Sequence, residues 1–164
     1  MKTLNAKLLE QFLNLVIKKL EGEWVLLGGT LIPALGIEYR QTVDIDFVPA
    51  GEMTNKTSLE LMGLAEKLGI AVESINASAG FFLKKIPDFS ERLVSLKKSK
   101  SCTIYRPTLD LYLELKLNRA SPTDLTDCIQ LIQYCKKMKL AEELKSGSKF
   151  LEKKDRRDIL RYFG

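Results

Sequence analysis

The chain has 164 residues, of which 45% are hydrophobic and 29% charged, and its formal net charge is +5. This length and balance predict one globular domain, and no apolar run is long enough to span a bilayer. The absence of histidine excludes histidine-based catalysis and histidine-ligated metals. Three cysteines without a CxxC pair argue against a disulfide framework or a zinc site.

The first 106 residues contain the predicted elements of a sheet with helices. Apolar residues at helical spacing predict helices, and short apolar runs bounded by glycine or proline predict strands. Thr57-Ser58-Leu59-Glu60 has the pattern of a capping box, and Gly69 fits a C-terminal cap. In chain order we expect a helix at 5–20, a strand at 24–27, a glycine turn at 28–29, a short helix at 30–35, a strand at 43–48, a helix at 57–68, a strand at 70–75, a segment at 81–86, and a hairpin of 92–96 with 102–105.

The remaining residues are predicted to be helical. Ser121 followed by Pro122 is typical of a helix start, and helices are expected over 108–118, 121–137 and 149–162. The order of elements predicts a mixed α/β (α+β) fold, a mixed β-sheet flanked by helices with a helical C-terminal part. We expect a single domain over 1–164, with a core at about 10–106 and C-terminal helices at about 108–164.

Two carboxylates, Asp44 and Asp46, lie within an apolar predicted strand. Side chains at positions i and i+2 share a strand face, so these acids are expected side by side, with Val43, Ile45 and Phe47 pointing into the core. Two like charges at this spacing repel each other, and a divalent cation between them removes that penalty. Carboxylates together with phosphate oxygens are ligands that Mg2+ or Mn2+ accepts.

Gly28 and Gly29 follow the predicted strand at 24–27. Glycine permits a positive φ and lets a ligand approach the backbone without a Cβ in the way. Thr30 then opens a short helix, where backbone N–H groups and a hydroxyl suit a phosphate. Taken singly, Gly-Gly is more often a tight turn, and D-x-D is more often a solvent-facing edge or a helix cap. Together they predict a site for a nucleoside triphosphate.

The combination of Gly28-Gly29-Thr30 with Asp44-Ile45-Asp46 resembles the signature of the polymerase-beta-like nucleotidyltransferase superfamily. The resemblance implies nucleotide binding by the glycines and Thr30. It also implies catalysis with two metal ions, Mg2+ or Mn2+, bound by the two aspartates.

The same resemblance implies a third carboxylate on a neighbouring strand. Glu73 is the main candidate for this catalytic acid, and Asp88 and Asp110 are others. Glu73 is equally consistent with a solvent-facing strand residue.

A second stretch, residues 113–131 (LELKLNRASPTDLTDCIQL), resembles a segment of bacterial nucleotidyltransferases related to abortive-infection toxins. The resemblance implies that Lys116 binds nucleotide and takes part in catalysis together with Asp124. The matching positions are Lys116, Leu117, Asp124 and Asp127.

Two positions of this stretch depart from the family pattern. Ser121 stands where the family has Arg, and Thr123 stands where it has Lys or Arg, while Arg119 lies two residues before Ser121. A structural interpretation is also open, in which Ser121 caps a helix, Asp124 favours its dipole and Lys116 is an exposed helix residue.

Three functional hypotheses follow. The first is a cytoplasmic, bacterial, toxin-type enzyme that moves a nucleoside monophosphate from an NTP to an RNA (for instance tRNA) or protein acceptor. The resemblance then implies an antitoxin protein as partner, and no membrane is involved. The second is a degenerate member that binds nucleotide or a partner without turnover. The third is an RNA-binding module, favoured by basic runs such as Lys97, Lys98 and Lys100.

Overall fold

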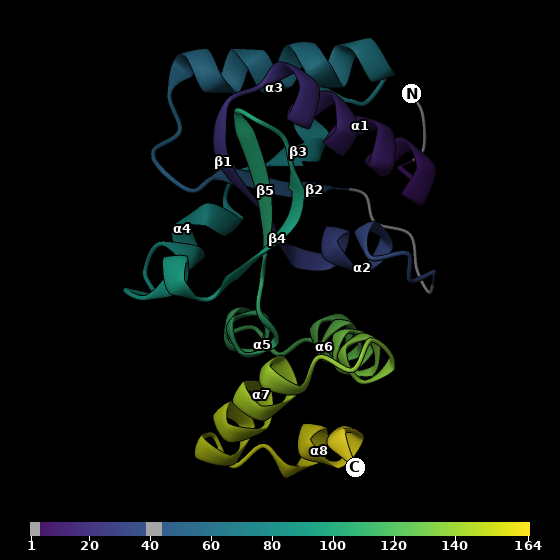
Figure 1. Cartoon of the computed structure of the whole chain (residues 1–164), viewed down its shortest axis with the longest axis vertical. Coiled ribbons are helices and arrows are strands. Elements are labelled where there is room, and N and C mark those ends of the chain that lie inside the picture. The colour runs from purple at the N-terminus through teal and green to yellow at the C-terminus, as the bar shows by residue number, and fades with distance from the viewer. Residues whose placement is uncertain (1–3, 39–43) are drawn as a thin grey trace. The chain divides into compact units, whose positions relative to one another are not determined.

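The computed structural model of the protein describes residues 4–38 and 44–164. The chain forms two compact units, Met1–Arg106 and Pro107–Gly164 (Figure 1). The predicted mixed α/β fold is confirmed, because the described part of the first unit combines a mixed sheet with helices and the second unit is helical. Within the described residues, no helix has both the length and the apolar character needed to cross a membrane. The single domain stays a prediction.

The sheet of the first unit has the strand order β3-β2-β1-β5-β4. The central strand β1 runs antiparallel to β2 and parallel to β5, and β2 runs parallel to β3. Asp46 on β2 therefore lies opposite Asn76 on β3. The strands are β1 (Gly22–Leu26), β2 (Ile45–Pro49), β3 (Ile75–Asn76), β4 (Leu93–Lys98) and β5 (Cys102–Pro107).

The core of the first unit lies between the sheet and helix α1 (Ala6–Lys19), which Asn5 caps by accepting from the Leu8 N–H. Phe12 meets Phe47 edge to face, with ring centroids 5.7 Å apart, and Trp24 stacks on Phe47 at 5.2 Å. Figure 1 shows α1 beside helix α3 (Asn55–Leu68), and the two helices are in contact. The apolar stripe predicted for residues 5–20 thus becomes the buried face of α1.

Helix α3 begins earlier than predicted. The capping box at Thr57 is wrong, because the N-cap is Thr54, whose hydroxyl accepts from the Thr57 N–H at 3.1 Å. Thr57 already lies inside the helix, where its own hydroxyl meets that of Thr54 at 2.8 Å. The predicted end is confirmed, since Gly69 has φ +72° at the C-terminal cap.

The predicted strand at 70–75 is also wrong over most of its length. Residues Val72–Ser74 form a 3-10 turn, η2, closed by the Ser74 N–H donating to the Ala71 carbonyl at 2.9 Å. Only Ile75 and Asn76 pair with β2, because the turn takes up the preceding residues. The segment at 81–86 contributes to helix α4 (Ala79–Leu83) and its C-terminal cap. Strand β2 is described from Ile45, and the predicted Val43 lies outside the described residues.

Strands β4 and β5 and the short elements complete the first unit. The expected hairpin is present, with the Ser99 N–H donating to the Cys102 carbonyl at 2.8 Å across its turn. The short elements are η1 (Gly28–Thr30), α2 (Leu31–Ala34) and η3 (Phe89–Glu91). The elements η1 and α2 connect β1 to β2, and η1 carries the glycine turn of the candidate site described below.

The second unit consists of α5 (Leu109–Leu117), α6 (Pro122–Lys137), α7 (Ala141–Lys153), α8 (Arg157–Leu160) and η4 (Arg161–Phe163). The helices predicted at 108–118 and 121–137 are confirmed, with Ser121 as the N-cap of α6. The single helix predicted at 149–162 is wrong. Helix α7 ends at Lys153, and Asp155 has φ +53°, which breaks the helical path before α8.

Candidate functional site

A glycine turn follows the central strand of the sheet and leads into η1. The Leu27 N–H donates to the Asp46 carbonyl at 2.8 Å, which continues the pairing of β1 with β2 up to this turn. Gly28 then has φ +62°, a conformation that favours glycine. The turn predicted at residues 28–29 is therefore confirmed, and it lies against the segment that carries the two acids.

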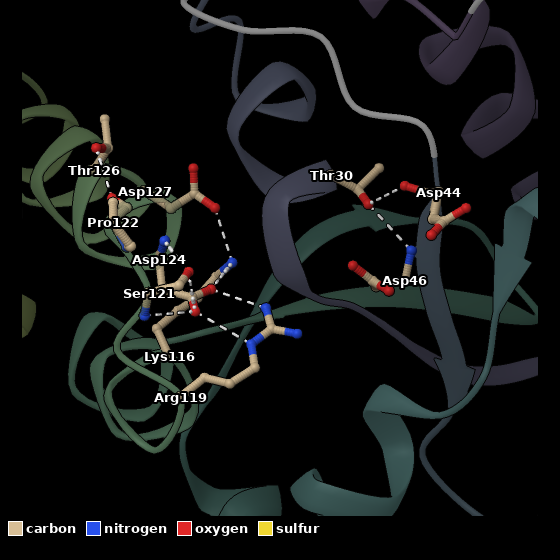
Figure 2. Close-up of polar contacts among 10 residues, drawn as sticks. All are labelled: Thr30, Asp44, Asp46, Lys116, Arg119, Ser121, Pro122, Asp124, Thr126 and Asp127. Carbon is tan, nitrogen blue, oxygen red and sulfur yellow. Dashed lines mark hydrogen bonds and ion pairs between the residues drawn. The ribbon is translucent and has the colours of Figure 1, made fainter.

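Thr30 joins the turn to that acidic segment. Its hydroxyl donates to the Asp44 carbonyl at 3.0 Å and accepts from the Asp46 N–H at 3.1 Å (Figure 2). The side chain is fully buried. Thr30 thus fixes the backbone of both acidic residues to the helical turn. The sequence predicted a phosphate contact for Thr30 but not this structural role. The phosphate contact itself stays a prediction.

Gly28 and the Asp46 carboxylate are in close contact. A Cβ added at Gly28 would lie 2.0 Å from Asp46 Oδ2 and 2.8 Å from its Cγ. Only a residue without a side chain leaves room for the carboxylate there. The sequence predicted that the glycines and the acids belong to one site, and this contact brings one member of each pair together.

The two acids differ in their surroundings. Asp44 is exposed and immediately precedes β2, whereas Asp46 is half-buried within the strand. Ile45 and Phe47 are fully buried, as the alternation of a strand predicts. Neither acid is removed from solvent, so both can meet a cation from solution.

Asn76 is a site residue that sequence reasoning missed. Its Nδ2 donates to Asp46 Oδ1 at 2.8 Å, while its Oδ1 accepts from the Ser78 N–H at 3.0 Å and from the Ser78 hydroxyl at 2.6 Å. Because Oδ1 is held by two donors, the amide presents N–H rather than oxygen to the acid. The Asn-x-Ser spacing was a signal for this local turn, but the pairing of β3 with β2 was not predictable from it.

The three candidates for a third carboxylate lie in different surroundings. Glu73 is exposed on the η2 turn, not on the predicted strand, and Asp88 pairs with Arg92 at 3.3 Å. Asp110, in the second unit, accepts from the Thr108 hydroxyl at 2.7 Å. No group of three His, Cys, Asp or Glu side chains suited to a metal occurs among the described residues. A catalytic role for Glu73 stays a prediction.

The second motif forms a buried charge cluster within the second unit. Lys116 on α5 is 6% exposed, and its Nζ donates to Asp127 Oδ2 at 2.8 Å and to Asp124 Oδ1 at 3.2 Å, both on α6 (Figure 2). Asp124 and Asp127 are themselves fully buried or nearly so. The interpretation of Lys116 as an exposed helix residue is therefore wrong, because the helix turns this side chain onto α6.

Asp124 also accepts hydrogen bonds from Arg119 and Ser121. Arg119 donates through Nη2 to Oδ1 at 2.8 Å and through Nε to Oδ2 at 3.2 Å. Ser121 donates its hydroxyl to Asp124 Oδ2 at 2.7 Å, and together they form a capping box at the start of α6. Arg119 thus supplies a guanidinium to this cluster, although the sequence places it two residues before the position where the family has one.

The protonation of the cluster follows from its burial and contacts. Burial raises the pKa of Asp127 to about 7. Burial also acts to raise the pKa of Asp124, but hydrogen bonds from Arg119 and Ser121 and the charge of Lys116 together hold it well below its usual range. Burial lowers the pKa of Lys116, against the opposing effect of the Asp124 charge. The contacts of all three groups are those of a packed charge cluster between α5 and α6.

Comparison of the chain with protein-family models, with curated proteins and with solved structures found no match.

The contact between Gly28 and Asp46 can be tested with matched glycine variants. Gly28→Ala should lower the free energy of unfolding by about 2 kcal/mol more than Gly36→Ala, because overpacking adds to backbone strain. Gly36 also has a positive φ, +81°, but an added Cβ there meets nothing within 4 Å. Chemical denaturation measures both losses. In an Asp46→Ala background the excess at Gly28 should largely disappear, and an undiminished excess would contradict the contact.

The buried lysine should be essential for stability. Lys116→Met should lower the free energy of unfolding by roughly 3–5 kcal/mol, because it removes the ammonium that two buried carboxylates share. Arg119→Met is the comparison variant, because its side chain is 78% exposed and Asp124 keeps its bonds to Lys116 and Ser121. The expected loss is smaller than that of Lys116→Met. Denaturation measures both losses. Equal losses in the two variants would contradict the role of Lys116 as the buried ammonium that Asp124 and Asp127 share.

The pH dependence of stability checks the same cluster. The folded-state pKa of Asp127, about 7, lies above its ordinary value of 3.8, so the folded protein binds this proton more tightly. Its contribution to the free energy of unfolding should fall as pH rises from about 4 to about 7, and change no further above that. Asp127→Asn should remove this fall in stability between about pH 4 and about pH 7. An unchanged fall in the variant would show that Asp127 is not its source.

Proposed function

We propose that the chain is a metal-dependent nucleotidyltransferase of the toxin type, which moves a nucleoside monophosphate from an NTP to an RNA or protein acceptor. The observation that supports this best is the contact of Gly28 with Asp46, where a Cβ would lie 2.0 Å from the carboxylate. This contact places an acid directly beside a glycine turn whose first residue, Gly28, is half-buried. That pairing suits a ligand carrying both a metal ion and phosphates.

Asp44 and Asp46 are the residues that would bind Mg2+ or Mn2+. Their oxygens are the ligand type these ions prefer, and the half-buried Asp46 is fixed in direction by Asn76, at 2.8 Å. The bound metal would neutralise the charge of the triphosphate and of the leaving pyrophosphate.

The other residues of the turn act on the nucleotide. In this proposal the half-buried Gly28 lets phosphate oxygens approach the backbone, whereas Gly29 is buried beneath it. Thr30 holds the turn against the acidic segment through its two hydrogen bonds. Catalytic roles for Glu73, Lys116 and Asp124 remain part of the proposal. The packed contacts of Lys116 and Asp124 already give those two residues a structural purpose.

One observation favours a second candidate function, nucleotide binding without turnover. The side chain that meets Asp46 from the neighbouring strand is an amide, Asn76, whose oxygen is occupied by Ser78. No third carboxylate joins the pair among the residues the structure describes. Binding a metal-bound NTP needs only the two aspartates, whereas activating an acceptor hydroxyl benefits from a further base.

Thermal unfolding with metal and nucleotide tests binding first. Mg2+ or Mn2+ with an NTP should raise Tm by several degrees, because a ligand at about 100 times its Kd stabilises the folded state by about 2.7 kcal/mol. Asp44→Asn and Asp46→Asn should abolish the rise. Glu10→Gln is the matched control, an exposed acid paired with Lys97 in the same unit. A shift that survives both aspartate variants would place the nucleotide elsewhere.

Transfer is measured with each α-labelled NTP, Mg2+, and total bacterial RNA or protein as acceptor. Label should appear in an acceptor and disappear with Asp46→Asn. Metal-dependent stabilisation without label in any acceptor would favour the second candidate over the first.

A further inference from the structure

Helix α4 carries two neighbouring aromatic side chains on its surface. Phe81 is 63% exposed and Phe82 is 55% exposed, although large apolar side chains in this unit are otherwise mostly buried. Their ring centroids lie 5.6 Å apart with an interplanar angle of 82°. The two rings therefore present differently oriented faces at one place on the surface.

A lysine lies directly over these rings. Lys85 Nζ is 4.2 Å from the Phe81 centroid and 5.8 Å from that of Phe82. The neighbouring Lys84 donates from Nζ to the Gly51 carbonyl, which fixes the end of α4 to the loop after β2. The end of α4 and the turn that follows it thus combine two aromatic faces with an ammonium, the two kinds of group that bind stacked bases and their phosphates.

This aromatic surface lies on the same side of β2 as the acid. A Cβ added at Gly80 of α4 would meet the Val48 Cγ1 at 3.0 Å, so the helix packs directly on the Val48 side chain. Val48 and Asp46 are two residues apart on one strand, so their side chains share a face roughly 6–7 Å apart. Ser78, the N-cap of α4, donates to Asn76 Oδ1 at the end of β3, and Asn76 in turn donates to Asp46.

We propose that Phe81, Phe82 and Lys85 form a stacking platform for single-stranded RNA, the acceptor of the proposed reaction. This inference rests on the proposed function, since it names the acceptor class for that site. An apolar protein segment would gain little from the ammonium, whereas RNA offers base faces for the rings and phosphates for the lysine. The formal net charge of +5 favours a polyanion in the same way.

Binding of a short fluorescein-labelled single-stranded RNA of mixed sequence, followed by fluorescence anisotropy in EDTA, tests the platform. Phe81→Ala and Phe82→Ala should each weaken binding about tenfold, the loss expected for one stacked base. Phe81→Tyr should retain binding. Leu59→Ala, on an exposed apolar residue of α3 that is 68% exposed, is the control and should bind like the wild type.

Phe81→Leu separates stacking from apolar docking. Leucine keeps the apolar surface but has no aromatic face, so this variant should lose RNA binding as Phe81→Ala does. Phe81→Trp supplies a direct signal, because the native Trp24 is buried, at 3% exposure. Its fluorescence should be quenched when RNA stacks on it.

Several results would overturn the platform. They are RNA affinity unchanged in both phenylalanine variants, retention of binding by Phe81→Leu, and a wild-type dimer that Phe81→Ala converts to monomer. Loss of metal–NTP stabilisation in Phe81→Ala with RNA binding intact would also overturn it, because the rings would then stack on the NTP base. RNA binding in EDTA is independent of the nucleotide site. Failure of RNA binding alone therefore contradicts the platform, and failure of metal–NTP binding alone contradicts the proposed function.

Discussion

The carboxylate of Asp46 fills the space in which a side chain at position 28 would stand. With a Cβ there only 2.0 Å from Oδ2, the turn after β1 can close against β2 only if glycine occupies it. Thr30 then ties the turn to the backbone of both acids, and Asn76 holds the carboxylate from β3. The turn η1 and the strands β2 and β3, which are distant in sequence, therefore all contribute contacts around Asp46. An acid held from several sides has a fixed direction, which a metal ligand requires.

The second unit depends on a different constraint, the sharing of one buried ammonium by two carboxylates. Lys116 joins α5 to α6 through Asp124 and Asp127, and breaking such a cluster costs far more than losing a surface ion pair. This packing alone explains why a lysine and two aspartates stand at these spacings. It assigns them a structural role in the second unit, and the proposal for nucleotide chemistry therefore depends chiefly on the first unit.

Local signals in the sequence predicted those features that depend on local physics. The glycine turn at Gly28, the cap at Gly69 and the start of α6 at Ser121 all follow from the conformational preferences of a few adjacent residues. Features that depend on distant partners were not predictable. The apolar run before Ile75 resembles a strand, yet Val72–Ser74 form a turn, and pairing with β2 begins only at Ile75. Asn76 lies beside Asp46 only because β3 pairs with β2.

The central claim is that Asp44 and Asp46 bind a metal ion that carries a nucleoside triphosphate over the glycine turn. A crystal structure with Mn2+ and a non-hydrolysable NTP analogue tests it most directly, because the anomalous signal of manganese locates the ion independently of the nucleotide. The account predicts the ion at about 2.0–2.3 Å from oxygens of both carboxylates, with phosphate oxygens beside the backbone of Gly28 and Gly29. An ion and nucleotide bound elsewhere, with both aspartates uncoordinated, would contradict it.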